Sequence, residues 1–311
     1  EAVRFAKSGS DAVSAAVRMA RALTGRDVVL CAGYHGWHDW YIGSTSRDRG
    51  VPKAVQDLTA AFRFDDLDHL DHVLDANRGE VAAVVVEPSG ATVPPPGHLE
   101  GIIERAHAHG ALCVFDEIIT GLRLAPGGAR ERYGVEPDLS CYGKALGNGM
   151  PVSAVAGRWE HMAMLEEVFF SGTHGGEALS LAAARAVLDT VADGTVLAGI
   201  ESLGQVMLDG VVSLVERHDV AHRVTVGGEP QRTVVGTCGP EPLIDKTWIQ
   251  QCLLEAGCLF NGSMFIAAAH TSGDVEIALE AFDQAFAGLA GDESVEDRLA
   301  GPVLEQVFRA P

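Results

Sequence analysis

Three residues with reactive side chains each follow an apolar run of the sequence: Glu87, Asp116 and Lys144. Apolar runs of this length suit buried parallel strands, and the ligands of open α/β sheets collect at the carboxyl ends of such strands. The carboxylate of Asp116 would be desolvated on its strand side, so it needs a cationic partner or a metal ion. Lys144 stands in the segment GKALGNG (143–149), whose glycines let the backbone approach a ligand closely.

Ser8, Gly9 and Ser10 open a helical pattern that runs to Gly25. The free N–H groups and the dipole at a helix N-terminus favour a phosphate. A phosphate cradle, a lysine amine and a buried carboxylate are what a pyridoxal-5′-phosphate (PLP) site requires. The lysine forms a Schiff base, and the carboxylate keeps the pyridine nitrogen protonated so that the ring acts as an electron sink. The ordered set predicts a PLP enzyme with its cofactor on Lys144, one of only four lysines.

Each of these signals has a rival interpretation. Residues 8–10 are also an ordinary helix cap. An apolar strand that ends in Asp-Glu suits a nucleotide hydrolase, but its loop needs a glycine where Asp138 stands and Ser or Thr where Ala145 stands. Two histidines in YHGWHDW (34–40) have metal-like spacing without the ligands that would complete a site, so we expect no metal.

The elements expected around these residues alternate between strands and helices. The apolar runs favour strands and the 3.6-residue periodicity favours helices, which together indicate an α/β domain with a mostly parallel sheet and helices on both faces. The expected strands are 28–31, 81–86, 111–115, 139–142 and 152–156, and the expected helices begin near residues 10, 98 and 177.

The pattern changes after His218. Short strands at 223–226 and 233–237 precede helices around 244–256 and 274–288, which indicates a smaller α+β domain. We therefore predict a large domain at 1–214 and a small C-terminal domain at 215–311.

Composition narrows the choice of partners. The net charge of −20 repels phosphate backbones, so nucleic acid and anionic membranes are not expected partners. No apolar run is expected to span a bilayer. The six cysteines form no C-x-x-C pair, which favours reduced thiols and a cytoplasmic protein.

The chain resembles the class III aminotransferases, which are PLP enzymes of fold type I. The resemblance is to the branch that includes glutamate-1-semialdehyde aminomutases and related sugar aminotransferases. It runs over nearly the whole chain and is most specific where the Asp, the Ile two places on and the Gly-Lys fall at the family's relative positions. The supporting segments are 7–27, 34–40, 84–90, 114–158 and 170–184.

The resemblance implies a role for each site residue. Lys144 would carry the cofactor and move protons, and Asp116 would pair with the pyridinium nitrogen. Ile118 and Tyr34 would pack on opposite faces of the ring. The remaining implied contacts are Ser8, Gly9 and Ser10 at the phosphate, Thr173 at the phosphate of the neighbouring subunit in a homodimer with shared active sites, and His35 and Glu87 nearby.

Two departures from the family pattern matter. Members usually carry a substantial segment before the phosphate-binding helix, whereas this chain begins almost at that helix. Either the segment lies outside this sequence or the protein is truncated, and full activity depends on which holds. The semialdehyde enzymes also usually have Gly-Asn-Pro after the phosphate-binding threonine, where this chain reads HGGE (174–177).

The second departure favours an aminotransferase that moves an amino group between an amino donor and an oxo-sugar or aminoglycoside-type acceptor. Trp37 and Trp40 could stack on a sugar ring, and Glu177 could accept hydrogen bonds from it or only cap a helix. Three alternatives remain open: glutamate-1-semialdehyde 2,1-aminomutase, a PLP-dependent sugar epimerase or dehydratase, and a non-catalytic dimeric paralogue.

Overall fold

The computed structural model describes residues 1–291 and 294–305 and divides into two compact units. The first contains residues 1–89 and 94–194, and the second contains residues 90–93 and the described residues from 195 onward. The second unit thus begins before the predicted boundary at 214/215, which lies inside helix α9 (Thr195–Arg217). The physical reason is that Met207, Val211 and Leu214 of α9 are part of the core of the second unit.

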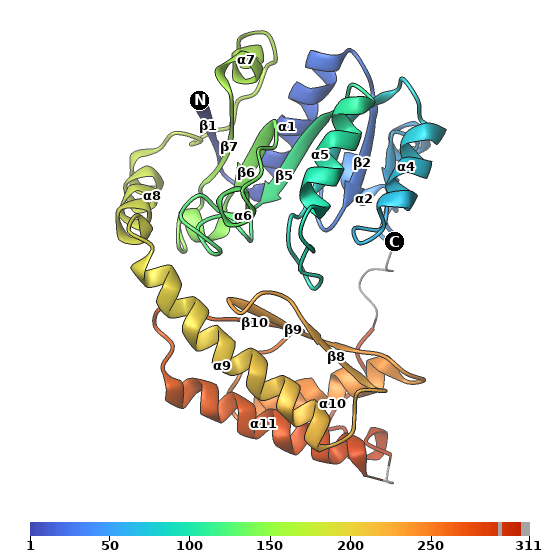
Figure 1. Cartoon of the computed structure of the whole chain (residues 1–311), viewed down its shortest axis with the longest axis vertical. Coiled ribbons are helices and arrows are strands. Elements are labelled where there is room, and N and C mark those ends of the chain that lie inside the picture. The colour runs from blue at the N-terminus through green and yellow to red at the C-terminus, as the bar shows by residue number, and fades with distance from the viewer. Residues whose placement is uncertain (292–293, 306–311) are drawn as a thin grey trace. The chain divides into compact units, whose positions relative to one another are not determined.

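A seven-stranded sheet forms the centre of the first unit, with the order β1-β7-β6-β5-β4-β2-β3 (Figure 1). All neighbouring pairs from β6 to β3 are parallel, whereas β7 runs antiparallel to both β6 and β1. The sheet is therefore mostly parallel, as predicted. The strands are β1 (Ala2–Ala6), β2 (Val28–Ala32), β3 (Thr59–Ala61), β4 (Val81–Val86), β5 (Leu112–Glu117), β6 (Leu139–Tyr142) and β7 (Ser153–Gly157).

Helices cover both faces of this sheet (Figure 1). Side chains alternate along β4, so that Val85 packs with helix α1 on one face while Val84 packs with helices α4 and α5 on the other. All six residues of β4 are buried, as expected for a central parallel strand. The helices of this unit are α1 (Gly9–Thr24), α2 (Asp39–Ile42), α3 (Lys53–Gln56), α4 (Leu67–Ala76), α5 (His98–Ala108), α6 (Ala129–Tyr133), α7 (Trp159–Met162) and α8 (Ala178–Val191), with 3₁₀ turns η1 (Lys144–Leu146) and η2 (Ala163–Glu166).

The sheet order brings the three reactive residues to one edge. Strands β4, β5 and β6 are neighbours and parallel. Glu87 directly follows β4, Asp116 is the penultimate residue of β5, and Lys144 lies two residues beyond β6. The carboxyl ends of three adjacent strands thus carry them, as the sequence predicted.

The second unit combines a small sheet with three long helices. The sheet is antiparallel in the order β10-β9-β8. The hydrophobic core of the unit includes Trp248 and Phe282. Besides α9, the elements are β8 (Val224–Gly227), β9 (Arg232–Thr237), α10 (Pro242–Glu255), β10 (Ser263–Phe265), α11 (Ser272–Ala290) and the 3₁₀ turn η3 (Glu296–Arg298).

Helix α9 corrects the expectation that no segment is long enough to span a bilayer. Its 23 residues include a window of mean hydropathy 1.3, which suffices by length and composition. Its buried residues Met207 and Val211 pack into the core of the second unit, and core helices commonly have such a composition.

Candidate active site

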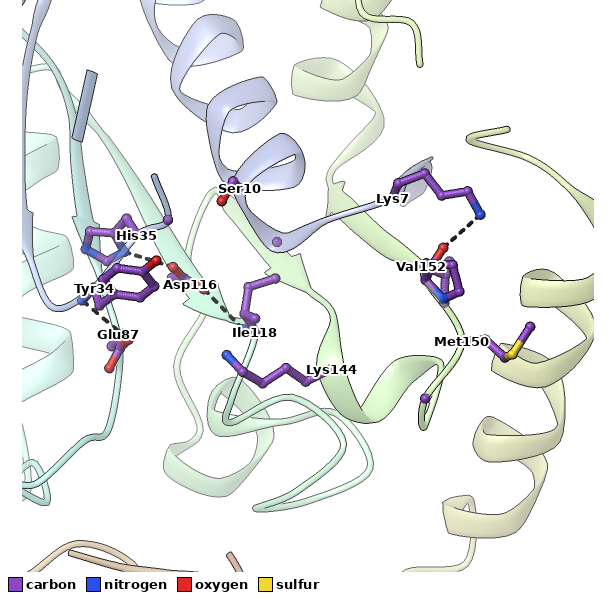
Figure 2. A pocket seen from close by; sticks show the side chains of 14 residues that line it. Lys7, Ser10, Tyr34, His35, Glu87, Asp116, Ile118, Lys144, Met150 and Val152 are labelled. Carbon is purple, nitrogen blue, oxygen red and sulfur yellow. Dashed lines mark hydrogen bonds and ion pairs between the residues drawn. The ribbon is translucent and has the colours of Figure 1, made fainter. Parts of the chain in front are cut away.

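A cavity of about 390 Å³ opens at the carboxyl ends of β4, β5 and β6 (Figure 2). Its volume is in the range typical of small-molecule and cofactor sites. All its lining residues belong to the first unit: Lys7, Gly9, Ser10, Tyr34, His35, Gly36, Glu87, Asp116, Ile118, Lys144, Gly149, Met150, Pro151 and Val152.

Eight of the ten residues singled out from the sequence line this cavity. Those absent from the lining are Ser8 and Thr173. The Ser8 side chain is used as the N-cap of α1, where its Oγ lies 2.7 Å from Asp11 Oδ2. Thr173 is exposed, and its assignment to the phosphate of a neighbouring subunit stays a prediction.

Asp116 is buried, and its carboxylate is held in a defined orientation. Oδ1 accepts the Ile118 amide at 3.1 Å, and Oδ2 lies 2.8 Å from Nδ1 of His35 (Figure 2). Because a carboxylate only accepts hydrogen bonds, the His35 Nδ1 must carry a proton. The Asp116 side chain is 4% exposed, and that of His35 is fully buried. A carboxylate buried in this way is stabilised by a positively charged group placed against it.

Burial affects the neighbours of Asp116 as well. Desolvation, reinforced by the charge of Asp116, raises the pKa of Cys141 well above its usual value. Desolvation also raises the pKa of Glu117, although its carboxylate accepts bonds from Thr120 Oγ1 and the amides of Ala129 and Arg130. Glu117 therefore organises the chain after β5, outside the cavity.

Lys144 adopts an uncommon backbone conformation at the edge of the cavity. Its φ angle is +39°, in the left-handed region that residues other than glycine rarely occupy. The Gly143 carbonyl accepts the Leu146 amide at 2.9 Å and closes the η1 turn around it. Strained conformations of this kind cluster at functional sites, where the surroundings hold a side chain in one direction. The side chain of Lys144 extends into the cavity (Figure 2).

The first turn of α1 forms another wall. Its capping box pairs Ser8 with Asp11, and the Ser8 carbonyl accepts the hydroxyl of Ser153 at 2.6 Å. The loop after β2 packs so closely on this turn that a Cβ at Gly36 would lie 2.2 Å from Ser10 Oγ. The glycine leaves room for the Ser10 hydroxyl, which faces the cavity beside the free N–H groups of the turn.

Two aromatic residues pack against the ring of His35. Trp40 stacks on the His35 ring at 6.2 Å between centroids, and Tyr41 meets its edge at 5.3 Å. Trp40 is buried, and neither Trp40 nor Trp37 lines the cavity. Stacking of Trp40 on a sugar ring is therefore not supported, because Trp40 packs in the core, whereas Trp37 is exposed outside the cavity lining.

Glu177 is the N-cap of α8, the second of the two roles that the sequence left open for it. Its carboxylate accepts the amides of Leu179 and Ser180 at 2.8 and 3.1 Å and forms an ion pair with Lys7 at 2.8 Å. Hydrogen bonds from Lys7 and Ser180 lower its pKa to about 2. The carboxylate is thus committed to the fold of its own chain.

Sequence reasoning missed one wall of the cavity. Lys7, Met150, Pro151 and Val152 line it without having been considered. Position 7 directly precedes the helix cap, and residues 150–152 follow the glycine-rich turn that was singled out. Proximity in sequence to those two motifs was the signal that could have found them.

The cavity fits PLP by its chemistry. The helix N-terminus and Ser10 can hold a phosphate, buried Asp116 can pair with a protonated ring nitrogen, and the Lys144 amine can bind an aldehyde carbon. His35 Nε2 is buried and has no hydrogen-bond partner in the described part of the chain. One polar atom of this wall could therefore form a hydrogen bond with a bound molecule.

Comparisons with known proteins agree with this geometry. The model of the family Aminotransferase class-III matches residues 1–231. A glutamate-1-semialdehyde 2,1-aminomutase of Symbiobacterium thermophilum is 35% identical over an alignment that covers 94% of this chain and 74% of the relative. A 3-aminobutyryl-CoA aminotransferase of Cloacimonas acidaminovorans is 40% identical over 56% of this chain and 43% of its own length.

Solved structures confirm the fold. The PLP-containing FumI protein of Sphingopyxis sp. MTA144 superposes with a TM-score of 0.83 at 29% identity, covering 93% of this chain and 71% of that chain. An omega-transaminase of Sphaerobacter thermophilus gives the same score at 25% identity, over 92% and 74%. The predicted fold-type I architecture and the predicted cofactor PLP are both confirmed by these matches.

Proposed function

The chain belongs to the class III aminotransferase family of PLP-dependent enzymes, and we propose that Lys144 and Asp116 are its catalytic residues in amino-group transfer between an amino donor and a carbonyl acceptor. The observation that carries the proposal is that Lys144, Asp116 and the first turn of α1 line one cavity. When bound, PLP supplies an electron sink that stabilises negative charge on the carbon bearing the amino group.

The chain's own residues would divide the remaining work. Lys144 Nζ would take the proton from the donor carbon as a general base and give it back as a general acid. Asp116 would favour the protonated form of the cofactor's ring nitrogen, and His35 orients Asp116 through the Nδ1–Oδ2 hydrogen bond. Ser10 and the α1 amides would hold the phosphate, while Tyr34 and Ile118 would lie against the ring.

For the acceptor we propose an oxo-sugar or a similar hydroxylated carbonyl compound. Two supports for this idea are gone, since Trp40 is buried and Glu177 caps α8. The composition of the cavity lining supports the proposal. Among the described residues, the lining includes the carboxylate of Glu87 but no arginine. A dicarboxylate-like substrate would favour a bidentate arginine, whereas hydroxyl groups pair readily with carboxylates and backbone groups.

A second candidate is glutamate-1-semialdehyde 2,1-aminomutase. The name of the relative from Symbiobacterium thermophilum favours it. The two candidates share the base and the cofactor and differ only in the molecule that accepts the amino group.

A single-turnover assay on the pyridoxamine-phosphate form separates these candidates. We expect a panel of oxo-sugars to return the protein to the PLP form faster than glutamate-1-semialdehyde does, as followed by absorbance and by mass spectrometry of the product. Faster turnover of glutamate-1-semialdehyde would reject the sugar proposal and establish the aminomutase.

We further propose a homodimer with shared active sites. Exposed apolar side chains in the first unit support it, because Phe169 is 82% exposed and Trp159 is 63% exposed, which is unfavourable in an isolated chain. Light scattering of the purified protein should give twice the chain mass at assay concentration, and Thr173→Ala should weaken PLP binding. A fully active monomer would contradict the proposal.

A further inference from the structure

Lys7 connects three segments around the cavity. Its Nζ donates to Glu177 Oε1 and to the Pro151 carbonyl, each at 2.8 Å, and lies 3.4 Å from Ser180 Oγ. Lys7 itself directly precedes Ser8, the cap of α1. One ammonium therefore ties the start of α1 to the start of α8 and to the loop before β7.

The geometry shows that this lysine is not a second cofactor amine. In Figure 2 its side chain points away from Lys144, and its Nζ donates to the Pro151 carbonyl. All three ammonium hydrogens have an acceptor in range. An amine with its donors committed in this way is a poor nucleophile.

The ion pair of Lys7 with Glu177 differs from that of Lys53 with Asp57. Its side chains are 24% and 29% exposed, whereas those of Lys53 and Asp57 are 78% and 56% exposed. A half-buried pair with additional hydrogen bonds holds a more fixed geometry than an exposed one, because water and salt screen it less. Lys53 therefore offers a matched control.

We propose that Lys7 is a positioning residue for the phosphate-binding turn: through Glu177 and the Pro151 carbonyl it fixes the first turn of α1 against the opposite wall of the cavity. This inference rests on the proposed function in one respect, namely that the turn at Gly9 and Ser10 binds the PLP phosphate. It also explains the departure at position 177, since a glutamate there provides the charge that Lys7 needs.

The turn has other supports, so that loss of Lys7 should loosen its position without unfolding it. The capping box between Ser8 and Asp11 does not involve Lys7, nor does the hydrogen bond from Ser153 Oγ to the Ser8 carbonyl. Glu177 likewise keeps the amides of α8. We therefore expect a substitution at Lys7 to act mainly by weakening the affinity for the phosphate group of the cofactor.

The test compares PLP with pyridoxal, which has the same ring and aldehyde but no phosphate. In Lys7→Met the dissociation constant for PLP should rise roughly fivefold, a typical size for a partly buried ion pair. The constant for pyridoxal should not change. Glu177→Gln should have a similar effect, and the double variant should be no worse than the stronger single variant, because the two residues act as a pair.

The same titrations contain the outcomes that would reject the inference. Lys53→Met is the control and should bind both compounds like the wild type. Equal weakening of PLP and pyridoxal, an unchanged PLP constant, or additive effects of the two substitutions would each overturn the role of Lys7. Failure of the proposed function looks different, since the wild-type protein would then bind PLP no better than pyridoxal.

Discussion

Replacement of Lys144 by alanine is expected to lower the rate of amino-group transfer by about four orders of magnitude, because covalent attachment and proton transfer are lost together. Borohydride reduction of the wild-type protein with PLP should fix the cofactor to the peptide that contains Lys144. In Lys144→Ala this label and the yellow colour of the bound form should disappear. Peptide mapping and a single-turnover assay measure the two effects.

Lys53→Ala is the control for this experiment, because Lys53 is exposed and lies outside the cavity. Lys7 is the other lysine in the cavity lining and the strongest competitor for the label. Its ammonium is already bound to Glu177 and the Pro151 carbonyl, so we expect no label there. A label on Lys7, Lys53 or Lys246 would disprove the assignment of Lys144.

The central sheet could be predicted because its signals are local. The runs at 81–86 and 139–142 give strands with those same bounds, since continuous apolar residues fit a strand that is covered on both faces. Strands β1 and β3 were missed. Each lies at an edge of the sheet, is short and is only partly buried, and such segments lack a continuous apolar run.

Antiparallel β7 marks a limit of another kind. Its apolar residues predict a strand, but its direction depends on how it pairs with β6, the preceding strand, and with β1, which is distant in sequence. The predicted domain boundary at 214/215 differs from the observed one for a similar reason. The apolar stripe of α9 is visible in the sequence, but the unit that it packs against is set by tertiary contacts with Phe282 and its neighbours.

At the candidate site, the sequence predicted the residues at the strand ends but missed the wall formed by Lys7 and residues 150–152. Asp116 and Lys144 follow strands that are neighbours, so sheet topology alone brings them together. Glu177 could only be given two alternatives, a substrate contact or a helix cap. Its partner Lys7 lies 170 positions away, a pairing that no local pattern reports.

The buried carboxylate of Asp116 leads to the second large effect. Asp116→Asn should slow removal of the donor proton by roughly 10²- to 10³-fold, the usual cost of losing one electrostatic contact to charge that develops in a reaction. An amide cannot hold a proton on the ring nitrogen, and a neutral ring is a poor electron sink. PLP should still bind measurably, because the phosphate and Lys144 contacts remain.

Deuterium exchange at the α-carbon of an amino donor, followed by NMR in D₂O, measures this step without knowledge of the acceptor. The matched control is Asp138→Asn, since Asp138 also flanks a central strand, accepting the Cys113 amide at 2.7 Å, but lies outside the cavity. His35→Gln should give an intermediate loss, because it removes the partner of Asp116 Oδ2 but keeps the carboxylate. An Asp116→Asn protein that exchanges the proton at the wild-type rate would show that the ring nitrogen needs no charged partner here, and the catalytic role of Asp116 would be wrong.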